Sequence, residues 1–271
     1  LFELLNIYLT ADVIIDGAIC RSNIFTGWGH YNNIGAMFAM VIPMPFFLTG
    51  KGRYAGFAYI SAILFYIGLV FTCSRTSILI GTPIFVITYI LSLCHRRHAR
   101  RQVGIHFGAL AAVALGVLIL EDDLLHLFRV FGEIGLESSG RLRIYELGIE
   151  QFKQFPIFGG TFFPVDVNIF SWSSSESFVA VFPPRWHNTF VQLLATGGVV
   201  CLLGYVYHRV QTVRVFVKDY SDEKLFAALS ILALLLTSML DCHFFNIGPV
   251  LLYSSTLAVV ECQLGNEKTR T

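Results

Sequence analysis

The chain has 271 residues, a mean hydropathy of +0.66 and 55% hydrophobic residues, but only 14% charged residues. A water-soluble domain typically carries about 25% charge, so much of this surface does not face water. The net charge of +1 gives no basis for a polyanionic nucleic-acid partner. Composition therefore predicts an integral membrane protein and excludes a nucleic-acid-binding function.

The first part of the chain, residues 1–33, is expected to be an outer segment. Residues 1–15 are apolar but hold Glu3 and Asp12. Two interpretations stay open for them: the end of a truncated helix whose earlier helices are missing, or an interfacial segment.

Apolar runs without Asp, Glu, Lys or Arg follow. A spanning helix needs about 20 apolar residues, and a backbone in hydrocarbon must pair its own polar groups. The sequence therefore predicts an all-α fold with about seven transmembrane helices. They are expected at 34–49, 54–74, 76–94, 102–120, 188–207, 225–240 and 242–260.

These spans divide the chain into parts. We expect a four-helix membrane part at 34–120, a large extracytoplasmic loop at 121–187, a three-helix membrane part at 188–262 and a cytoplasmic tail at 263–271. Short connections rich in Lys and Arg stay in the cytoplasm. The basic residues that set this orientation are Lys51, Arg53, those of HRRHARR at 95–101, Arg209, Arg214, Lys218, Lys224, Lys268 and Arg270.

The outer loop has the pattern of a folded segment, because structureless loops of this length are usually functional. Ser138-Ser139-Gly140 supplies a helix start. Leu142, Tyr145, Ile149 and Phe152 then share one helix face, and Pro156 and Gly159-Gly160 end it. We expect an amphipathic helix at 140–155, on the membrane or across the mouth of the bundle. Residues 161–184 are expected to be irregular.

A few charged residues of the outer segments are candidates for chemistry. Arg75 lies between two uncharged runs, where a charge is functional by default, although snorkelling to the interface is the alternative. Arg141 and Arg143 open the loop helix, where the helix dipole does not favour them. They suit phosphate recognition, or else pair with Glu137 or Glu146. His187, beside Arg185, can act as a base or donor near pH 7, or be structural.

No metal or nucleotide motif is present. The sequence lacks HExxH, paired cysteines and a GxxxxGK[ST] loop. We expect no cofactor and no metal site, and a group transfer that draws on a pre-activated donor rather than ATP. The six cysteines are expected to be small apolar residues, with a disulfide among Cys20, Cys73 and Cys242 left open.

Three segments resemble motifs of the O-antigen ligase and O-antigen polymerase family of bacterial membrane glycosyltransferases. They are TCSRTSILIG, SGRLRIYELGIEQFKQFPIFGG and RWHNTFVQLLATGGVVCLLGYV, and GWGHYNNIGAMFAMVIP is similar to an earlier Asn-containing segment. The likeness covers roughly residues 20–210. It departs from the family pattern at Tyr145, where Trp is frequent, and at Gly159-Gly160, which replaces Gly-x-Gly.

The resemblance implies a polyprenyl pyrophosphate-linked glycan donor and transfer to a glycan or lipid acceptor. The site would face outward from the bacterial cytoplasmic (inner) membrane in a multi-pass protein among membrane lipids. It implies that Arg75 and Arg141 bind the pyrophosphate and that His187 activates the acceptor hydroxyl. Arg143 and Arg185 are substrate-binding candidates. The other candidate bases are Glu137, Asp166 and Glu176.

Two other classes were weighed. A transporter or flippase for a lipid-linked or anionic substrate predicts charges near the midplane and internal repeats, and neither stands out. A non-catalytic scaffold would not need arginines and a histidine on one face. Ligase and polymerase are not distinguished, and neither are the donor sugar and the acceptor.

Overall fold

A computed structural model describes residues 2–10, 14–15, 18–19, 23–50, 54–95, 141–160, 186–218 and 221–268. The described chain is almost wholly helical, which confirms the all-α prediction. Its helices are α1 (Phe2–Thr10), α2 (Tyr31–Val41), η2 (Met44–Gly50), α3 (Ala55–Phe71), α4 (Arg75–His95), α7 (Arg141–Gln154), α8 (Thr189–Val217), α9 (Asp222–Ser238), η7 (His243–Phe245) and α10 (Ile247–Lys268).

Two short antiparallel hairpins precede α2, and the sequence pattern did not predict them. Strand β1 (Ile14–Ile15) pairs with β2 (Ala18–Ile19), and β3 (Phe25–Thr26) pairs with β4 (Gly29–His30). Gly29 has a φ of 110°, a backbone angle that residues with a side chain rarely adopt. The second hairpin is tied to α1, because the Gly27 N–H donates to Glu3 Oε1 at 2.7 Å.

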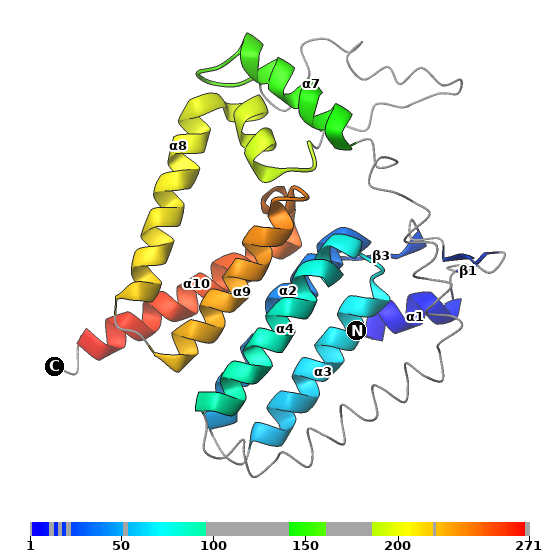
Figure 1. Ribbon diagram of the computed structural model, residues 1–271, viewed down its shortest axis with the longest axis vertical. Coiled ribbons are helices and arrows are strands. Elements are labelled where there is room, and N and C mark those ends of the chain that lie inside the picture. The colour runs from blue at the N-terminus through cyan, green and yellow to red at the C-terminus, as the bar shows by residue number, and fades with distance from the viewer. Residues whose placement is uncertain are drawn as a thin grey trace.

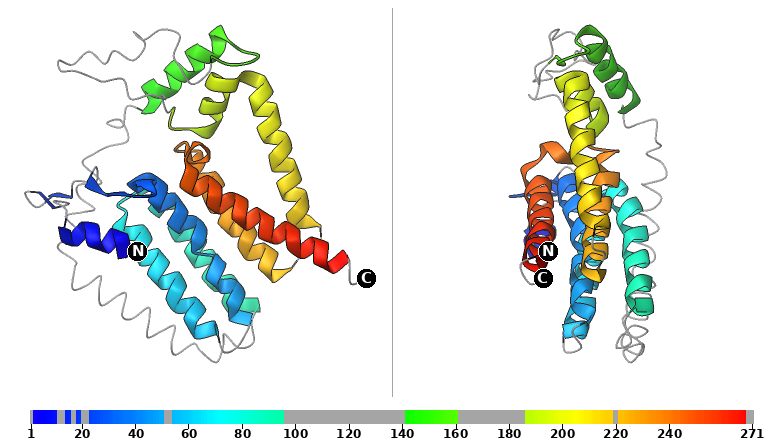
Figure 2. Two further views of the ribbon diagram at one scale, coloured as in Figure 1. Left: turned by 180° about the vertical axis from the view of Figure 1, so that it is seen from behind. Right: turned by 90° about the vertical axis from the view of Figure 1, so that its left-hand side faces the viewer.

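Helix α2 is the centre of the bundle. It packs against α3, α4, α9 and α10, which run side by side in Figures 1 and 2. Ala36 and Ala39 are fully buried on it, and Ala39 packs in one cluster with Leu69 of α3 and Ala233 of α9. Small residues at such contacts allow helices to approach closely in a membrane, where packing rather than water exclusion holds them.

Three described stretches are long and apolar enough to cross a membrane: Tyr31–Leu48, Arg75–Cys94 and Thr189–Val217. The stretches Ala55–Phe71, Lys224–Ser238 and Ile247–Cys262 are shorter apolar helices. The predicted spans at 34–49, 54–74, 76–94, 188–207, 225–240 and 242–260 thus all fall on helices. The span predicted at 102–120 and most of the loop at 121–187 lie outside the described residues, so the count of about seven spans stays a prediction.

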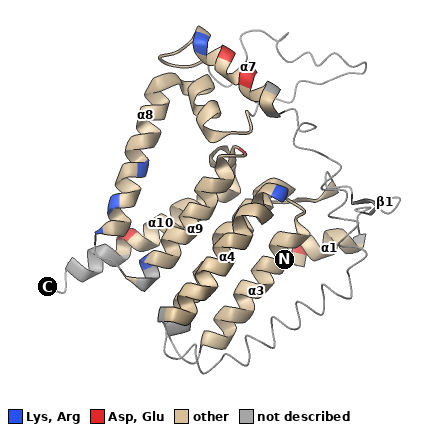
Figure 3. Ribbon diagram, in the orientation of Figure 1, with Lys and Arg blue, Asp and Glu red and all other residues tan. Residues whose placement is uncertain are grey.

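The helices expose large apolar side chains. Leu79 on α4 is 69% exposed, Phe57 on α3 64% and Leu203 on α8 62%. Along the bodies of α2, α3 and α4 the ribbon of Figure 3 is almost free of charged residues, which lie toward helix ends and on α7 and α8. Exposed apolar faces of this kind indicate contact with lipid.

Helix α8 is not the straight span that the sequence analysis expected at 188–207. It breaks at Gly198, whose φ is 62° and ψ −161°, into a first arm before the break and a second arm after it. The arms meet at an angle in Figure 1, with the first arm under α7. Glycine adopts this conformation without a steric cost, so Gly197-Gly198 marks a bend in the helix.

The structure places Arg209 beside the α9–α10 connection. The sequence analysis grouped it with Arg214 and Lys218 in a cytoplasmic connection and placed the α9–α10 connection outside. These two placements conflict, because the Arg209 guanidinium lies 4.3 Å from the centroid of Phe244 in η7, within the α9–α10 connection.

The amphipathic helix predicted at 140–155 is confirmed as α7, Arg141–Gln154. Of the predicted apolar face, Leu142 is 72% exposed, whereas Tyr145, Ile149 and Phe152 are half-buried. The helix packs on α8 through Leu147, Gly148 and Gln151. Gly148 decides this choice, because a Cβ there would lie 2.5 Å from Val191 Cγ1.

Candidate functional site

The RWHN segment is held by its neighbours at the start of α8. Asn188 caps the helix, its Oδ1 accepting from the N–H groups of Phe190 at 2.9 Å and Val191 at 3.1 Å. Its Nδ2 donates to the carbonyl of Met239 at 2.7 Å, at the end of α9. Trp186 is buried, and its backbone N–H donates to Gln192 Oε1 at 3.0 Å. The residue between them, His187, is therefore fixed on both sides.

His187 has a φ of 49°, a left-handed backbone conformation that is uncommon for a residue other than glycine. The carbonyl of His187 accepts from the Tyr145 hydroxyl of α7 at 3.1 Å. Strain of this kind costs on the order of 1–3 kcal/mol and persists where the surroundings over-determine the residue. It gathers at functional sites, and here it turns the half-buried imidazole toward the α9–α10 connection.

The imidazole meets a carboxylate there. His187 Nδ1 lies 3.3 Å from Asp241 Oδ1, and Asp241 is buried, with 6% of its surface exposed. Asp241 Oδ1 also accepts from the N–H of Cys242 at 2.7 Å, and Oδ2 accepts from Asn32 Nδ2 at 3.0 Å. The carboxylate is thus engaged on both oxygens.

The charge state of Asp241 follows from these contacts. Burial alone raises the pKa of this carboxyl, but the hydrogen bond and charge of His187, the charge of His243 and the N–H of Cys242 outweigh it. The pKa of Asp241 therefore falls below its usual range. Asp241 therefore stays a carboxylate at neutral pH.

A chain of hydrogen bonds continues from Asp241 to the TCSRTS turn. The Ser74 hydroxyl donates to Asn32 Oδ1 at 3.0 Å, and the Ser74 and Ser77 hydroxyls lie 2.9 Å apart. Both serines are fully buried. Gly35 allows this approach, because a Cβ there would lie 2.7 Å from Ser77 Oγ. We call Ser77, Ser74, Asn32, Asp241 and His187 the polar chain.

Arg75 begins α4 directly after the polar chain reaches Ser74. It is half-buried, and Cys73 before it has a left-handed φ of 52°. The two motifs predicted to carry chemistry, around Arg75 and around His187, are thus linked through Asn32 and Asp241. His243 supports the same region from α10's side, its Nδ1 3.1 Å from Asn33 Oδ1.

The loop motif and the His-Asn motif also meet. The PIFGG turn after α7 docks into the break of α8: the N–H of Val199 donates to the Pro156 carbonyl at 2.9 Å, and the N–H of Gly160 to the Ala195 carbonyl at 2.8 Å. Gln151 Nε2 donates to the same Ala195 carbonyl at 3.0 Å. These bonds replace those that the break removes from α8, as a backbone at a membrane surface requires.

The predicted site residues have different outcomes. His187 lies at one end of the polar chain, and Arg75 directly follows Ser74 near the other end. The side chains of Arg141 and Arg143 and the whole of Arg185 lie outside the described residues, although Arg141 begins α7. The start of α7 lies above the end of the bundle where α4 begins in Figures 1 and 2. The alternative bases Glu137, Asp166 and Glu176 are also outside the description.

Two site residues were missed. Asp241 was placed in an outer connection but given no role, and Asn32 was noted only within its segment. The available signal was an acid between two uncharged apolar runs, the criterion that singled out Arg75. The disulfide left open between Cys73 and Cys242 is not formed. Within the described ranges no three His, Cys, Asp or Glu side chains gather as a metal-binding group, which leaves metal independence a prediction.

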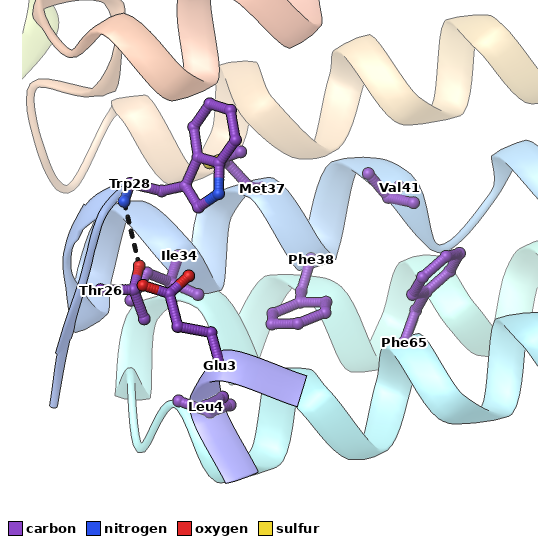
Figure 4. A pocket seen from close by; sticks show the side chains of 9 residues that line it. All are labelled: Glu3, Leu4, Thr26, Trp28, Ile34, Met37, Phe38, Val41 and Phe65. Carbon is purple, nitrogen blue, oxygen red and sulfur yellow. Dashed lines mark hydrogen bonds between the residues drawn. The ribbon is translucent and has the colours of Figure 1, made fainter. Parts of the chain in front are cut away.

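A separate pocket of about 200 Å³ lies on another face of α2 (Figure 4). Its lining is apolar except for Thr26 and Glu3, and the Glu3 carboxylate already accepts from Gly27. None of the polar chain lines it, so it offers no group for chemistry on a hydroxyl or a phosphate. Its remaining lining residues are Leu4, Trp28, Ile34, Met37, Phe38, Val41 and Phe65.

Comparison with known proteins gives one family. Residues 60–206 match the family model described as O-antigen ligase, which is more than half of the chain. The matched range includes the Arg75 turn, α7 and the first arm of α8. No curated protein and no solved structure matches the chain.

Proposed function

The chain belongs to the O-antigen ligase family, and from this premise we propose that it transfers a glycan from undecaprenyl pyrophosphate to an acceptor hydroxyl. The family supports a surface polysaccharide ligase or polymerase, an enzyme of glycosyl transfer between a lipid-linked donor and an acceptor. The proposal adds the carrier and the place, which is the outer face of the cytoplasmic membrane. The family match also favours this class over a transporter or flippase.

The observation that carries the proposal is the contact between His187 Nδ1 and Asp241 Oδ1 at 3.3 Å. A carboxylate within ion-pair distance of Nδ1 favours the proton on that nitrogen, which leaves a lone pair on Nε2. His187 Nε2 is then suited to take the proton of an acceptor hydroxyl. Asp241 would stabilise the imidazolium that results, because its own lowered pKa keeps it ionised.

The proposed step balances without a cofactor. The acceptor oxygen forms a bond to the anomeric carbon as the bond from that carbon to the pyrophosphate oxygen breaks. The proton of the acceptor passes to His187 Nε2, and the electron pair leaves with the polyprenyl pyrophosphate. Arg75 and Arg141 would neutralise the charge that grows on this leaving group, since the guanidinium fork matches phosphate oxygens.

The polar chain supports a shared site for these groups. Arg75 directly follows Ser74, which is joined through Asn32 to Asp241 and so to His187. Hydrogen bonds to a carboxylate are stronger than those between neutral groups, so this link holds the Arg75 turn and the imidazole in a fixed relation. A fixed relation is needed where one group binds the donor and another activates the acceptor.

Transfer by the purified full chain in lipid vesicles tests the proposal. The donor is an undecaprenyl pyrophosphate glycan and the acceptor a purified lipid core or glycan, with chelator present and no ATP. We expect transfer that releases polyprenyl pyrophosphate. Transport of the donor without transfer would support a flippase instead, and a requirement for a divalent ion would contradict the metal-independent step.

Ligase and polymerase differ in the acceptor. Glycan analysis of cells that lack the gene distinguishes them. Loss of polymer attachment with the polymer still made indicates a ligase, and retention of single repeats with loss of chain length indicates a polymerase.

A further inference from the structure

Arg209 lies within a group of aromatic rings. Its Cζ is 4.5 Å from the centroid of Tyr205, 4.3 Å from that of Phe244 and 4.8 Å from that of Tyr253. Its Nη1 donates to the Tyr253 hydroxyl at 2.8 Å. A guanidinium at these distances from ring faces is held by cation–π attraction, which grows as water is removed.

Arg214 shows what an ordinary arginine of the same helix does. It is exposed, and its Nη1 reaches Gln211 Oε1 only at 3.4 Å. Arg209 is half-buried instead, and its side chain leaves α8 to reach two other elements. Snorkelling to water therefore explains Arg214 and does not explain Arg209.

The rings around Arg209 form a row that joins separate elements. Phe190 of the first α8 arm meets Tyr205 of the second arm at 5.8 Å between centroids. Tyr205 meets Phe244 of η7 at 6.0 Å, and Phe244 meets Tyr253 of α10 at 5.3 Å. The row thus ties both arms of the bent helix to the α9–α10 connection. We call Arg209 and these four rings the aromatic clamp.

The clamp adjoins two segments of the candidate site: the α9–α10 connection, which holds Asp241, and the start of α8, which follows His187. Phe244 belongs to the same short connection as Asp241, and Phe190 to the same helix start as His187. Three hydrogen bonds also tie the start of α8 to the α9–α10 connection: Asn188 Nδ2 donates to the Met239 carbonyl at 2.7 Å, the Thr189 hydroxyl to the Asp241 carbonyl at 3.4 Å, and the Cys242 thiol to Gln192 Oε1 at 3.4 Å. The aromatic clamp adds to these bonds a contact between the α9–α10 connection and the second arm of α8, beyond the bend at Gly198.

We infer that Arg209 is a positioning residue for the transfer reaction: through Phe244 and Tyr205 it fixes the bend of α8 so that Asp241 meets His187. This inference rests on the proposed function. Arg209 would not touch the donor or the acceptor. Its loss should lower the rate of transfer and leave the affinity for both substrates unchanged. A displacement of about 1 Å in a reacting group can cost as much as 10²-fold in rate.

The test uses the purified full chain in lipid vesicles with Arg209→Met, Arg209→Lys and the matched control Arg214→Met. Arg209→Met should lower kcat roughly tenfold to 10²-fold with KM for donor and acceptor within about twofold. Arg209→Lys should recover part of the loss, because the ammonium keeps the cation and loses the planar stacking. Arg214→Met should behave as the unsubstituted chain.

A double-substitution cycle separates positioning from general stability. If Arg209 acts through the pair, Arg209→Met should lower kcat much less in an Asp241→Asn background than in the unsubstituted chain. Equal factors in the two backgrounds would overturn the inference, and so would a rise in KM with kcat unchanged.

Hydrogen exchange of residues 241–246 gives a readout that needs no activity. Arg209→Met should speed exchange there, and Arg214→Met should not. Faster exchange with unchanged kcat would refute the positioning role and leave the proposed function standing. An unsubstituted chain that folds but does not transfer would refute the proposed function by itself, and unchanged exchange in Arg209→Met would refute the clamp.

Discussion

Replacing Asp241 by Asn tests the acceptor-activating pair with little change in shape. Asp241 uses Oδ1 for His187 and for the Cys242 N–H, and Oδ2 for Asn32 Nδ2. An amide has one oxygen, so in one orientation its NH₂ faces Asn32 Nδ2, and in the other it faces His187 and the Cys242 N–H. Either orientation removes the charge and at least one hydrogen bond.

The expected size follows from the contact that is lost. A hydrogen bond to a charged group contributes about 1.5–3 kcal/mol, which is roughly tenfold to 10²-fold in rate if it is lost only in the transition state. A wrong His187 tautomer would add to this, since general-base catalysis contributes about 10²–10⁴-fold. We expect kcat for Asp241→Asn to fall about 10²-fold, with donor binding unchanged.

The assay measures single-turnover transfer in vesicles at a donor concentration well above the Kd of the donor, so that the enzyme is saturated. His187→Ala and the double variant accompany it, and the double variant should equal His187→Ala because the two residues act as a unit. The reasoning would be refuted if Asp241→Asn lowered kcat by less than about threefold. It would also be refuted if the loss in the double variant equalled the product of the two single losses.

Further predictions concern charge, packing and topology. The stability that the lowered pKa of Asp241 provides is fully present above its unfolded pKa of about 3.9 and is lost as pH falls through the lower folded pKa. The unfolding midpoints of the unsubstituted chain and Asp241→Asn should thus differ by a constant amount from pH 5 to 8 and converge below about pH 4, and a gap that widens in acid would contradict this. Gly198→Ala should destabilise the chain by about 1–3 kcal/mol, because φ is 62° and a Cβ would lie 2.3 Å from the Ile157 carbonyl oxygen. Gly204→Ala is its control, with nothing within 4 Å of its Cβ, and should be neutral or stabilising in thermal unfolding. Arg75→Lys and Arg141→Lys should each lower transfer about 10²–10³-fold with the protein still in the membrane, and near-normal rates would remove them from the site. Cysteine labelling of intact cells should reach position 166 and not position 98, and the reverse would invert the topology.

The helices could be predicted because their signals are local. Uncharged runs marked the bundle, and the start signal at Ser138-Ser139-Gly140 with the stop at Pro156 marked α7. The bend of α8 was not predicted, because Gly197-Gly198 continues an apolar run and hydropathy does not report backbone angles. The docked PIFGG turn supplies hydrogen bonds to backbone groups that the bend leaves without helical partners. That contact joins segments far apart in the chain.

The site could be predicted in part for the same reason. Arg75 and His187 stand out as polar groups beside apolar runs, and motif likeness added Arg141. Asn32 and Asp241 acquire meaning only when α2 and the α9–α10 connection lie side by side, a separation of 209 residues in sequence. The buried face of α7 also depends on tertiary packing. The absence of a side chain at Gly148 lets Val191 of α8 pack closely against α7 there.

The most direct test of the account compares His187→Ala with the unsubstituted chain in two measurements on the same vesicles, binding of the undecaprenyl pyrophosphate glycan and its transfer to an acceptor. The account predicts unchanged donor binding with transfer lower by about 10²-fold or more, because the base that takes the acceptor proton is gone while the arginines remain. Near-normal transfer by His187→Ala would contradict the central claim.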